Sequence, residues 1–310
     1  GITPVMITGD HPVTAQAIAK ETGILKHSMD RVITGAELSV LSDDEFEKEI
    51  EYIKVYARVS PEQKLNIVKA LQNKNHFVAM TGDGVNDAPA LKRANIGIAM
   101  GITGSDVSKE AAHMILLDDN FATIIRAVKE GRRIFDNILK FIKYSITGNC
   151  GKIWTIFLAP LIGLPIPLLP IQILWLNLVT DGLPGLAFAA EPAENNILQR
   201  KPRRPNDSIF SNGAGFQILW VGLLMGGVSI SAQAWAIHIG NEKWMTMVFT
   251  ILSISQMGQA MAGRSNWNSV FSQGILGNKE LVGAVLLTFG LQMAVIYIPF
   301  LQDIFSTQSL

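Results

Sequence analysis

Five long apolar stretches in the second half of the chain constrain its fold more than any other feature. A bilayer core of about 30 Å is crossed by roughly 20 helical residues, and each stretch is about that long. The backbone in such a stretch must be helical, because lipid offers no partners to exposed N–H and C=O groups. The sequence therefore predicts five spans, at residues 144–163, 168–190, 216–239, 244–261 and 281–300.

Charged residues gather in the other half of the chain, among the first 143 positions. The 26 Lys and Arg residues balance the 26 Asp and Glu residues, so net charge gives no reason to expect a nucleic-acid partner. The single cysteine, Cys150, excludes a disulfide within the chain. Residues 1–20 are mixed and polar and do not resemble a secretory signal.

The first 133 residues alternate short apolar runs with stretches of helical periodicity. We expect strands at residues 5–8, 77–81, 96–100 and 114–117, with helices between them at 12–22, 44–52, 61–72, 88–94 and 106–112. Alternating strands and helices favour a parallel sheet covered on both faces. The predicted fold is a doubly wound α/β domain over residues 1–133, followed by an all-α transmembrane bundle over residues 134–310.

Two of the predicted strands end in the same tripeptide, Thr-Gly-Asp. Ligands of open α/β sheets bind at the carboxyl ends of strands, so both copies are expected at one edge of the sheet. A lone Thr-Gly-Asp is usually only a turn, and the repetition is what makes it a candidate site. Its residues are Thr8, Gly9 and Asp10 in the first copy and Thr81, Gly82 and Asp83 in the second.

The second copy extends into the eleven-residue run TGDGVNDAPAL at residues 81–91. Gly82 and Gly84 let the backbone turn sharply and approach a ligand closely. Carboxylate and amide oxygens are the ligands that Mg²⁺ prefers, often together with phosphate. The run supplies three such side chains, Asp83, Asn86 and Asp87.

A capped helix start precedes this run. Ser60 can cap the helix, Pro61 suits its first position, and Gln63 can reach back to complete a capping box. Lys64 follows in the first turn and could supply a cation to a phosphoryl group. A lone lysine there would more often be a solvated helix residue.

Polar residues inside the predicted spans are the informative ones, because burying them in hydrocarbon is costly. Asn149 and Lys152 share one helical face of the first span. The second span carries Asn177, Thr180 and Asp181, followed by Gly182 and Pro184, which can loosen the helix and free carbonyl groups. Gln256 and Gln259 lie in the fourth span, where hydrogen bonding between helices explains them equally well.

Basic residues favour one orientation of the spans. If the α/β half is cytoplasmic, only Lys243 lies on an outer connection, which agrees with the positive-inside rule. The basic run 131–143 continues into the first span without a break. The inner flanks hold Arg132, Arg133, Lys140, Lys143, Arg200, Lys201, Arg203, Arg204, Arg264 and Lys279.

Several motifs together resemble those of P-type ATPases. TGDGVNDAPAL resembles the hinge motif of the family's phosphorylation domain, MITGDHPVTAQAIA its upstream phosphate site, and ARVSPEQK the segment with its phosphate-binding lysine. WLNLVTDGLP at residues 175–184 is similar to the sixth membrane helix of the sarco/endoplasmic reticulum calcium pump and its bacterial relatives. The five spans would then be membrane helices five to nine of ten, and we expect the chain to be cut at both ends.

The resemblance implies a haloacid-dehalogenase-like phosphorylation domain and an ATP cycle through an aspartyl phosphate. It implies that Thr8, Gly9 and Lys64 contact the phosphoryl group, with Asp10 beside them. Asp83 would bind Mg²⁺, with Asn86 and Asp87 completing that shell. Thr81, Gly82, Asp83 and Gly84 would form the cofactor-binding loop. Asn149, Asn177, Thr180 and Asp181 would be ligands of the transported cation, with Gln256 as a further ligand.

The chain departs from the family pattern in two respects. The DKTGT motif with the nucleophilic aspartate is absent, as are the nucleotide domain, the actuator domain and helices one to four and ten. The covalent step needs that carboxylate, so the chain by itself is expected to be inactive. The calcium-pump pattern also has glutamates where this chain has Lys152 and Gln256. We expect Lys152 to pair with Asp181 and to stand in for one of two bound ions.

Three alternatives remain open from the sequence. Calcium is the expected cargo, with ATP and Mg²⁺ as cofactors, but sodium, manganese or protons are alternatives because Lys152 alters the site. A membrane-anchored phosphohydrolase would share the α/β site, and a non-catalytic truncated membrane protein would need no nucleophile. We expect a multi-pass protein of a bacterial plasma membrane or an organellar membrane.

Overall fold

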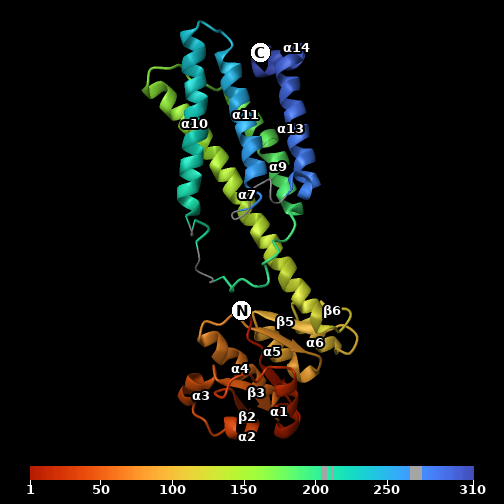
Figure 1. The fold of residues 1–310 in the computed structure, drawn as a ribbon. Helices are drawn as coiled ribbons and strands as arrows, with labels where there is room; N and C mark the ends of the chain where they lie inside the picture. The colour runs from red at the N-terminus through yellow and green to blue at the C-terminus, as the bar shows by residue number, and fades with distance from the viewer. Residues whose placement is uncertain (204–207, 211–212, 266–273) are drawn as a thin grey trace. The chain divides into compact units, whose positions relative to one another are not determined.

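The computed structural model describes residues 1–203, 208–210, 213–265 and 274–310. The chain divides into two compact units, Gly1–Val128 and Lys129–Leu310 (Figure 1). One 41-residue helix, α7 (Phe121–Leu161), runs through the boundary between them. The predicted continuity of the basic run 131–143 with the first span is therefore confirmed. The domain boundary expected at residue 133 falls inside this helix and stays a prediction.

The first unit contains two three-stranded parallel sheets. One has the order β1 (Met6–Thr8), β3 (Ile53–Ala57), β2 (Arg31–Thr34), and the other the order β4 (Ala79–Gly82), β5 (Ile96–Met100), β6 (Met114–Leu116). The four predicted strands and their parallel arrangement are confirmed, although the hydrogen bonding forms two sheets where one was expected. Strand β2 was missed because its apolar run is only Val32–Ile33, and β3 was missed because Lys54 interrupts its run.

Strand β3 is buried on both faces. Val55 and Ala57 pack against Ala15 and Ala19 of helix α1 (Pro12–Glu21). Tyr56 packs in a second cluster, with side chains of helices α3 (Asp43–Glu49) and α4 (Pro61–Asn73). Burial on both faces is typical of parallel strands. The other helices of this unit are α2 (Gly35–Leu38), α5 (Ala88–Arg93) and α6 (Asp106–Ala111), with a 3₁₀ turn at Val85–Asp87.

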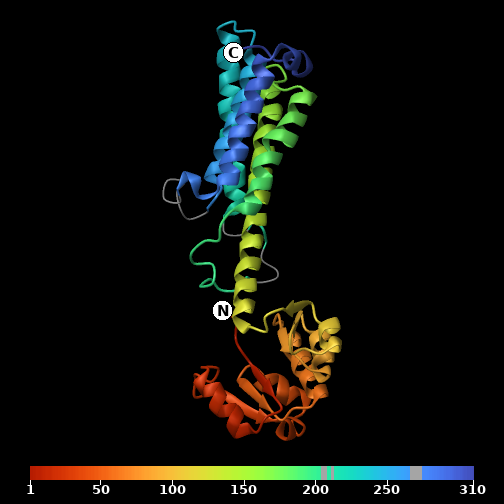
Figure 2. The ribbon, with the colours of Figure 1, turned by 90° about the vertical axis from the view of Figure 1, so that its right-hand side faces the viewer.

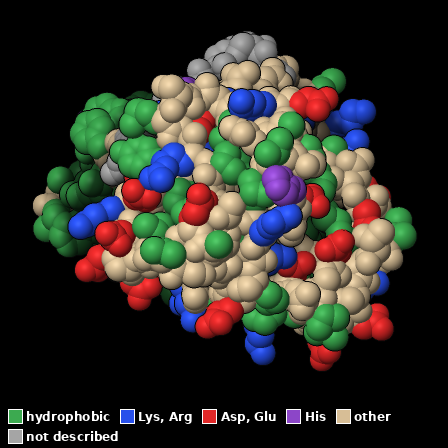
Figure 3. Space-filling view, turned by 90° about the horizontal axis from the view of Figure 1, so that it is seen from below, with side chains coloured by type: hydrophobic (Ala, Val, Ile, Leu, Met, Phe, Trp, Pro, Cys, Tyr) green, Lys and Arg blue, Asp and Glu red, His purple; other side chains and the backbone are tan. Residues whose placement is uncertain are grey.

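The predicted start of helix α4 is confirmed. Ser60 Oγ accepts a hydrogen bond from the Gln63 amide at 3.2 Å, and Gln63 Oε1 accepts one from the Ser60 amide at 2.8 Å. Gln63 also donates to the Gly35 carbonyl at 2.7 Å, which ties α4 to α2. On the face seen in Figure 3, basic, acidic and hydrophobic side chains are interspersed.

The second unit is helical, as predicted. The second half of α7, α10 (Ala214–His238), α11 (Trp244–Ala262) and α13 (Lys279–Tyr297) run alongside one another (Figures 1 and 2). The stretch expected as the second span is irregular. It comprises α8 (Pro170–Trp175), a π-helical turn (Leu176–Thr180), α9 (Gly182–Ala187) and a 3₁₀ turn (Phe188–Ala190). The short elements η4 (Ile275–Gly277) and α14 (Pro299–Phe305) flank α13.

Among the described residues, three helices are long and apolar enough to cross a membrane, by length and composition. They are Pro170–Ala190, Ala214–His238 and Lys279–Tyr297, and they overlap three of the five predicted spans. The other two predicted spans lie on α7 and α11, whose buried polar side chains, such as Lys152 and Gln256, make them less apolar. The five-span topology stays a prediction.

Glycines let α7 and α10 approach closely. A Cβ added to Gly222 would lie 2.7 Å from the Cys150 Cβ, and one added to Gly226 would lie 2.8 Å from the Trp154 Cβ. Close approach through small residues is typical of packed membrane helices. Cys150 acts here as a packing residue, as expected from the sequence. The two contacts also show that α7 and α10 run in the same direction.

We predict that Ser60→Ala lowers the free energy of unfolding of the first unit by about 1 kcal/mol, because the N-terminal amides of α4 lose their side-chain acceptor. Chemical denaturation followed by limited proteolysis measures the change. Ser28→Ala is the matched control, since Ser28 is exposed and, among the described residues, makes no side-chain hydrogen bond. Equal stability of the two variants would contradict the capping role.

Candidate functional site

The first Thr-Gly-Asp tripeptide forms an exposed turn at the carboxyl end of β1. Thr8 pairs in register with Ala57 of β3, so both strands end at the same edge. The Thr8 hydroxyl donates to Asp10 Oδ2 at 3.0 Å and accepts from the Asp10 amide at 3.1 Å. Gly9 has open space where a Cβ would stand. The turn therefore presents its hydroxyl, backbone amides and carboxylate to solvent.

The second tripeptide leads to an ion pair. Lys64 Nζ on α4 lies 2.6 Å from Asp87 Oδ1, and Asp87 Oδ2 accepts a hydrogen bond from the Gly84 amide at 3.2 Å. A Cβ on Gly82 would stand 2.5 Å from the Asp87 Cβ, so only glycine fits there. The structure thus brings together Lys64 and Asp87, which lie 23 residues apart in the sequence.

Asp83 and Asn86 lie exposed on the same loop, while Thr81 is partly buried. The backbone of Asp83 is held from the loop after β5. Its carbonyl accepts hydrogen bonds from the Ser105 amide at 2.8 Å and from the Ser108 hydroxyl at 3.0 Å. Ser108 is fully buried. Sequence reasoning missed both serines, although a serine directly before helix α6 is a recognisable capping signal.

Asp119 holds the start of that same loop. Its carboxylate accepts hydrogen bonds from the amides of Gly101, Ile102 and Thr103 and from the Thr103 hydroxyl, at 2.6 to 3.0 Å. These bonds, led by the one from Ile102, lower the pKa of Asp119 to about 2. Because the folded-state pKa is lowered, the stabilisation is present above the ordinary Asp pKa and is lost as pH falls toward 2.

The oxygen atoms of this loop can supply part of the coordination shell of a Mg²⁺ ion. Asp83 offers an exposed carboxylate, whereas both oxygens of Asp87 are already engaged by Lys64 and Gly84. No group of three or more His, Cys, Asp or Glu side chains that could hold a metal occurs in the part of the chain that the structure describes. The Asp83 carboxylate therefore fits a Mg²⁺ ion that takes further oxygens from phosphate or from outside this chain.

A buried ion pair lies in the second unit. Lys152 Nζ is 2.7 Å from Asp181 Oδ2 and 2.5 Å from Asn177 Oδ1. Lys152 is 4% exposed and Asp181 7% exposed. The expected pairing of Lys152 with Asp181 is therefore confirmed. A charged lysine here is stable only because both polar partners meet it.

The backbone is irregular just before Asp181. The Asp181 amide bonds to the Leu176 carbonyl at 2.9 Å, five residues back, so the turn is wider than an α-helical turn. The Tyr144 hydroxyl donates to the Thr180 carbonyl at 2.9 Å. Sequence reasoning placed the loosening at Gly182 and Pro184, whereas the wide turn lies before them. Pro184 has no N–H for the Thr180 carbonyl four residues back, which accepts the Tyr144 hydroxyl instead.

Some polar atoms near this pair lack partners among the described residues. Asp181 Oδ1 and both amide atoms of Gln256 are buried without a hydrogen bond. Gln256 packs against Gly148, one helical turn before Lys152 on α7, since a Cβ on Gly148 would meet its Nε2 at 2.0 Å. Unsatisfied buried polar atoms call for a ligand or water. Asn149 lies exposed on α7 and, among the described residues, makes no hydrogen bond to this group.

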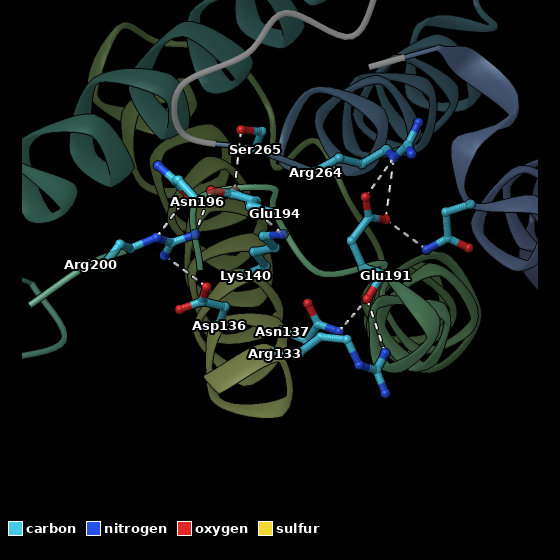
Figure 4. Close-up of polar contacts among 11 residues, drawn as sticks. Arg133, Asp136, Asn137, Lys140, Glu191, Glu194, Asn196, Arg200, Arg264 and Ser265 are labelled. Carbon is cyan, nitrogen blue, oxygen red and sulfur yellow. Dashed lines mark hydrogen bonds and ion pairs between the residues drawn. The ribbon is translucent and has the colours of Figure 1, made fainter. Parts of the chain in front are cut away.

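A second buried network was missed from the sequence (Figure 4). The Glu191 carboxylate accepts hydrogen bonds from Arg264 Nε at 3.1 Å and from Asn278 Nδ2 at 2.7 Å. Its backbone carbonyl accepts from Asn137 at 2.8 Å and from Arg133 at 3.1 Å. Glu191, Arg264 and Asn278 are each 3% exposed or less. The network joins the end of the α9 segment to α7, α11 and the start of α13.

The sequence identified Arg264 and Arg133 only as basic residues at the expected inner flanks of the spans. It did not indicate which residues they would pair with. Arg200 likewise pairs with Asp136 at 2.9 Å and with Glu194 at 2.7 Å, and Lys140 lies 3.8 Å from Glu194 (Figure 4). Several of these flank residues are thus structural partners in the second unit. Arg204, also counted as a flank charge, lies outside the described residues.

Comparisons with known proteins agree with this arrangement. Residues 165–310 match the family model described as cation transporting ATPase, C-terminus, and residues 1–95 match that of haloacid dehalogenase-like hydrolases. These matches confirm the predicted fold class and the resemblance to P-type ATPases. The chain is thus similar to part of the cation-transporting ATPases, a family whose members in general use ATP and Mg²⁺.

The similar relatives include calcium pumps. The chain is 48% identical to a calcium-transporting ATPase of Bacillus subtilis, over 99% of this chain and 35% of that protein. It is 46% identical to a calcium-transporting ATPase of Listeria monocytogenes (99% and 34%) and 37% identical to an endoplasmic reticulum calcium ATPase of Aspergillus fumigatus (99% and 35%). The chain spans about a third of the length of these relatives.

We predict that Arg264→Leu destabilises the second unit by about 3–5 kcal/mol, because the Glu191 carboxylate is left buried without its cation. Thermal unfolding of the purified protein in detergent measures the loss. Adding Glu191→Gln to Arg264→Leu removes the stranded charge and should recover a large part of the stability. A double variant no more stable than Arg264→Leu would contradict the pairing as the cause.

Proposed function

We propose that this chain is part of an ATP-driven calcium transporter that works through an aspartyl-phosphate cycle. The observation that carries the proposal is the 48% identity to a calcium-transporting ATPase along nearly the whole chain. The buried Lys152–Asp181 pair beside a π-helical turn supports it, since intramembrane ionisable residues mark ion pathways. The nucleophilic aspartate and the nucleotide domain would come from the rest of the full-length protein.

In this proposal the first unit handles the phosphoryl group. Thr8 and Gly9 would present a hydroxyl and a backbone amide at the end of β1, with the Asp10 carboxylate beside them. Lys64 supplies a positive charge whose position Asp87 holds. Asp83 and Asn86 would hold Mg²⁺ on the Thr81–Gly84 loop. Bound Mg²⁺ would neutralise phosphate charge. The contacts of Ser105 and Ser108 keep the Asp83 backbone in place for that role.

The second unit would carry the cation. Asn177, Thr180 and Asp181 form a short polar stretch at the π-helical turn, and Lys152 occupies part of it with its own positive charge. Calcium prefers six to eight oxygen ligands, and a charged lysine offers none. We therefore propose one cation per cycle, with Lys152 in place of a second ion. Gln256 and Asn149 are proposed as further ligands.

The helix α7 links the two proposed sites along the chain, because it starts shortly after β6 and includes Lys152. We propose a multi-pass membrane protein with five spans in the second unit and the α/β unit on the cytoplasmic side. The Lys and Arg residues at the expected inner flanks support this orientation. The membrane would be a bacterial plasma membrane or an organellar membrane.

Membrane vesicles that contain the full-length protein should take up ⁴⁵Ca²⁺ when ATP is added. We expect Asp181→Asn to reduce the uptake at least about tenfold, because a buried carboxylate ligand is lost. Asp303→Asn is the control, since Asp303 is exposed on α14. ATP-driven uptake of sodium, manganese or protons without calcium would overturn the calcium assignment, and the absence of any ATP-driven uptake would overturn the pump.

Replacing Lys152 with glutamate tests the stoichiometry. The variant removes the internal cation and adds two oxygen ligands, so we expect calcium ions moved per ATP to rise from one to two. Lys152→Arg keeps the charge and is the matched control. Simultaneous measurement of ⁴⁵Ca²⁺ uptake and phosphate release gives the ratio. An unchanged ratio in an active Lys152→Glu protein would disprove the role of Lys152 as a counter-charge.

A further inference from the structure

A cavity of about 310 Å³ lies among helices α7, α10 and α11 of the second unit. It is separate from the proposed cation site, because Lys152, Asn177 and Asp181 do not line it. Both polar and apolar side chains form its walls. The lining includes Lys140 and Lys143 of α7, Gln217, Val221, Leu224 and Val228 of α10, and Gln259 of α11.

One end of the cavity is basic. Lys140 and Lys143 lie three residues apart, on one face of α7. Both side chains line the cavity, and burial lowers the pKa of Lys143. Lys140 is buried, and its nearest carboxylate, Glu194 at 3.8 Å, is shared with the closer Arg200 (Figure 4). An anion in the cavity would stabilise both ammonium groups.

A hydrogen-bond acceptor also faces this cavity. Gln259 lines it, and its Oε1 is buried without a partner among the described residues. A carbonyl oxygen in that position needs a donor such as a hydroxyl group. A ligand with both a phosphate and a hydroxylated headgroup would bring an anion to the two lysines and a hydrogen-bond donor to Gln259.

The other walls are apolar and favour a lipid over a free phosphate. Because α10 runs in the same direction as α7, its side chains from Gln217 to Val228 lead away from the lysines along the membrane segment. Leu224 and Val228 line the cavity and are still 54% and 50% exposed, and Trp220 beside them is 56% exposed. An acyl chain would cover this surface, whereas a soluble anion would leave it bare.

We propose that this cavity binds an anionic phospholipid with a hydroxylated headgroup, such as phosphatidylglycerol. Its phosphate would lie between Lys140 and Lys143, its headgroup hydroxyl would donate to Gln259, and its acyl chain would follow Val221, Leu224 and Val228. Basic pockets between membrane helices are known to hold such headgroups. The proposal rests on the membrane placement of the second unit proposed above.

Native mass spectrometry of the full-length protein in detergent tests the site by titration with phosphatidylglycerol and with phosphatidylcholine. The wild-type protein should retain the anionic lipid preferentially. Lys143→Gln should weaken that retention about fivefold, the effect of one lysine near a membrane surface. Val221→Trp should also weaken it, because the indole fills the cavity. Lys243→Gln is the control, since Lys243 is an exposed lysine next to α11.

Equal retention of the two lipids, or unchanged retention in both cavity variants, would overturn the proposal. Displacement of phosphatidylglycerol by millimolar inorganic phosphate would identify a soluble anion as the ligand and would overturn the lipid assignment. ⁴⁵Ca²⁺ uptake is measured on the same preparations. Lysine-dependent lipid retention without uptake would refute only the transport proposal, and uptake without selective retention would refute only the lipid site.

Discussion

The ion pair between Lys152 and Asp181 is the interaction on which the second unit depends most. Two charges that are both nearly buried are tolerated only when each meets the other, and here Asn177 completes the lysine's surroundings. The pair joins α7 to the irregular segment around the π-helical turn. It therefore both holds two helices together and occupies the place where the family resemblance expects cation ligands.

The first unit also contains a lysine–aspartate ion pair at its candidate site. Lys64 from α4 meets Asp87 from the loop after β4, and Gly82 leaves the room that Asp87 needs. The loop is then fastened from the other side by Ser105 and Ser108. In both units a lysine and an aspartate from separate segments meet next to the proposed chemistry. Each pair fixes the position of a charge before any ligand arrives.

The patterns that could be read in advance were local ones. The capping box of Ser60 and Gln63 and the strand before Thr81 follow from chemistry within a few residues. The buried partner of Lys152 follows because a buried charge is costly and needs an opposite charge beside it. The central strand β3 could not be predicted this way, because Lys54 breaks its apolar run. The sequence also does not show which helices bury its two faces.

The sequence by itself determined the two-part organisation, the Thr-Gly-Asp turns and the family, because these rest on composition, periodicity and motifs. Only the tertiary structure decided which charges meet. The Glu191–Arg264–Asn278 network and the cavity beside Lys143 join residues far apart in the chain. The free energies of these interactions depend on burial and on the distances between atoms. Both are set only when the helices pack against one another.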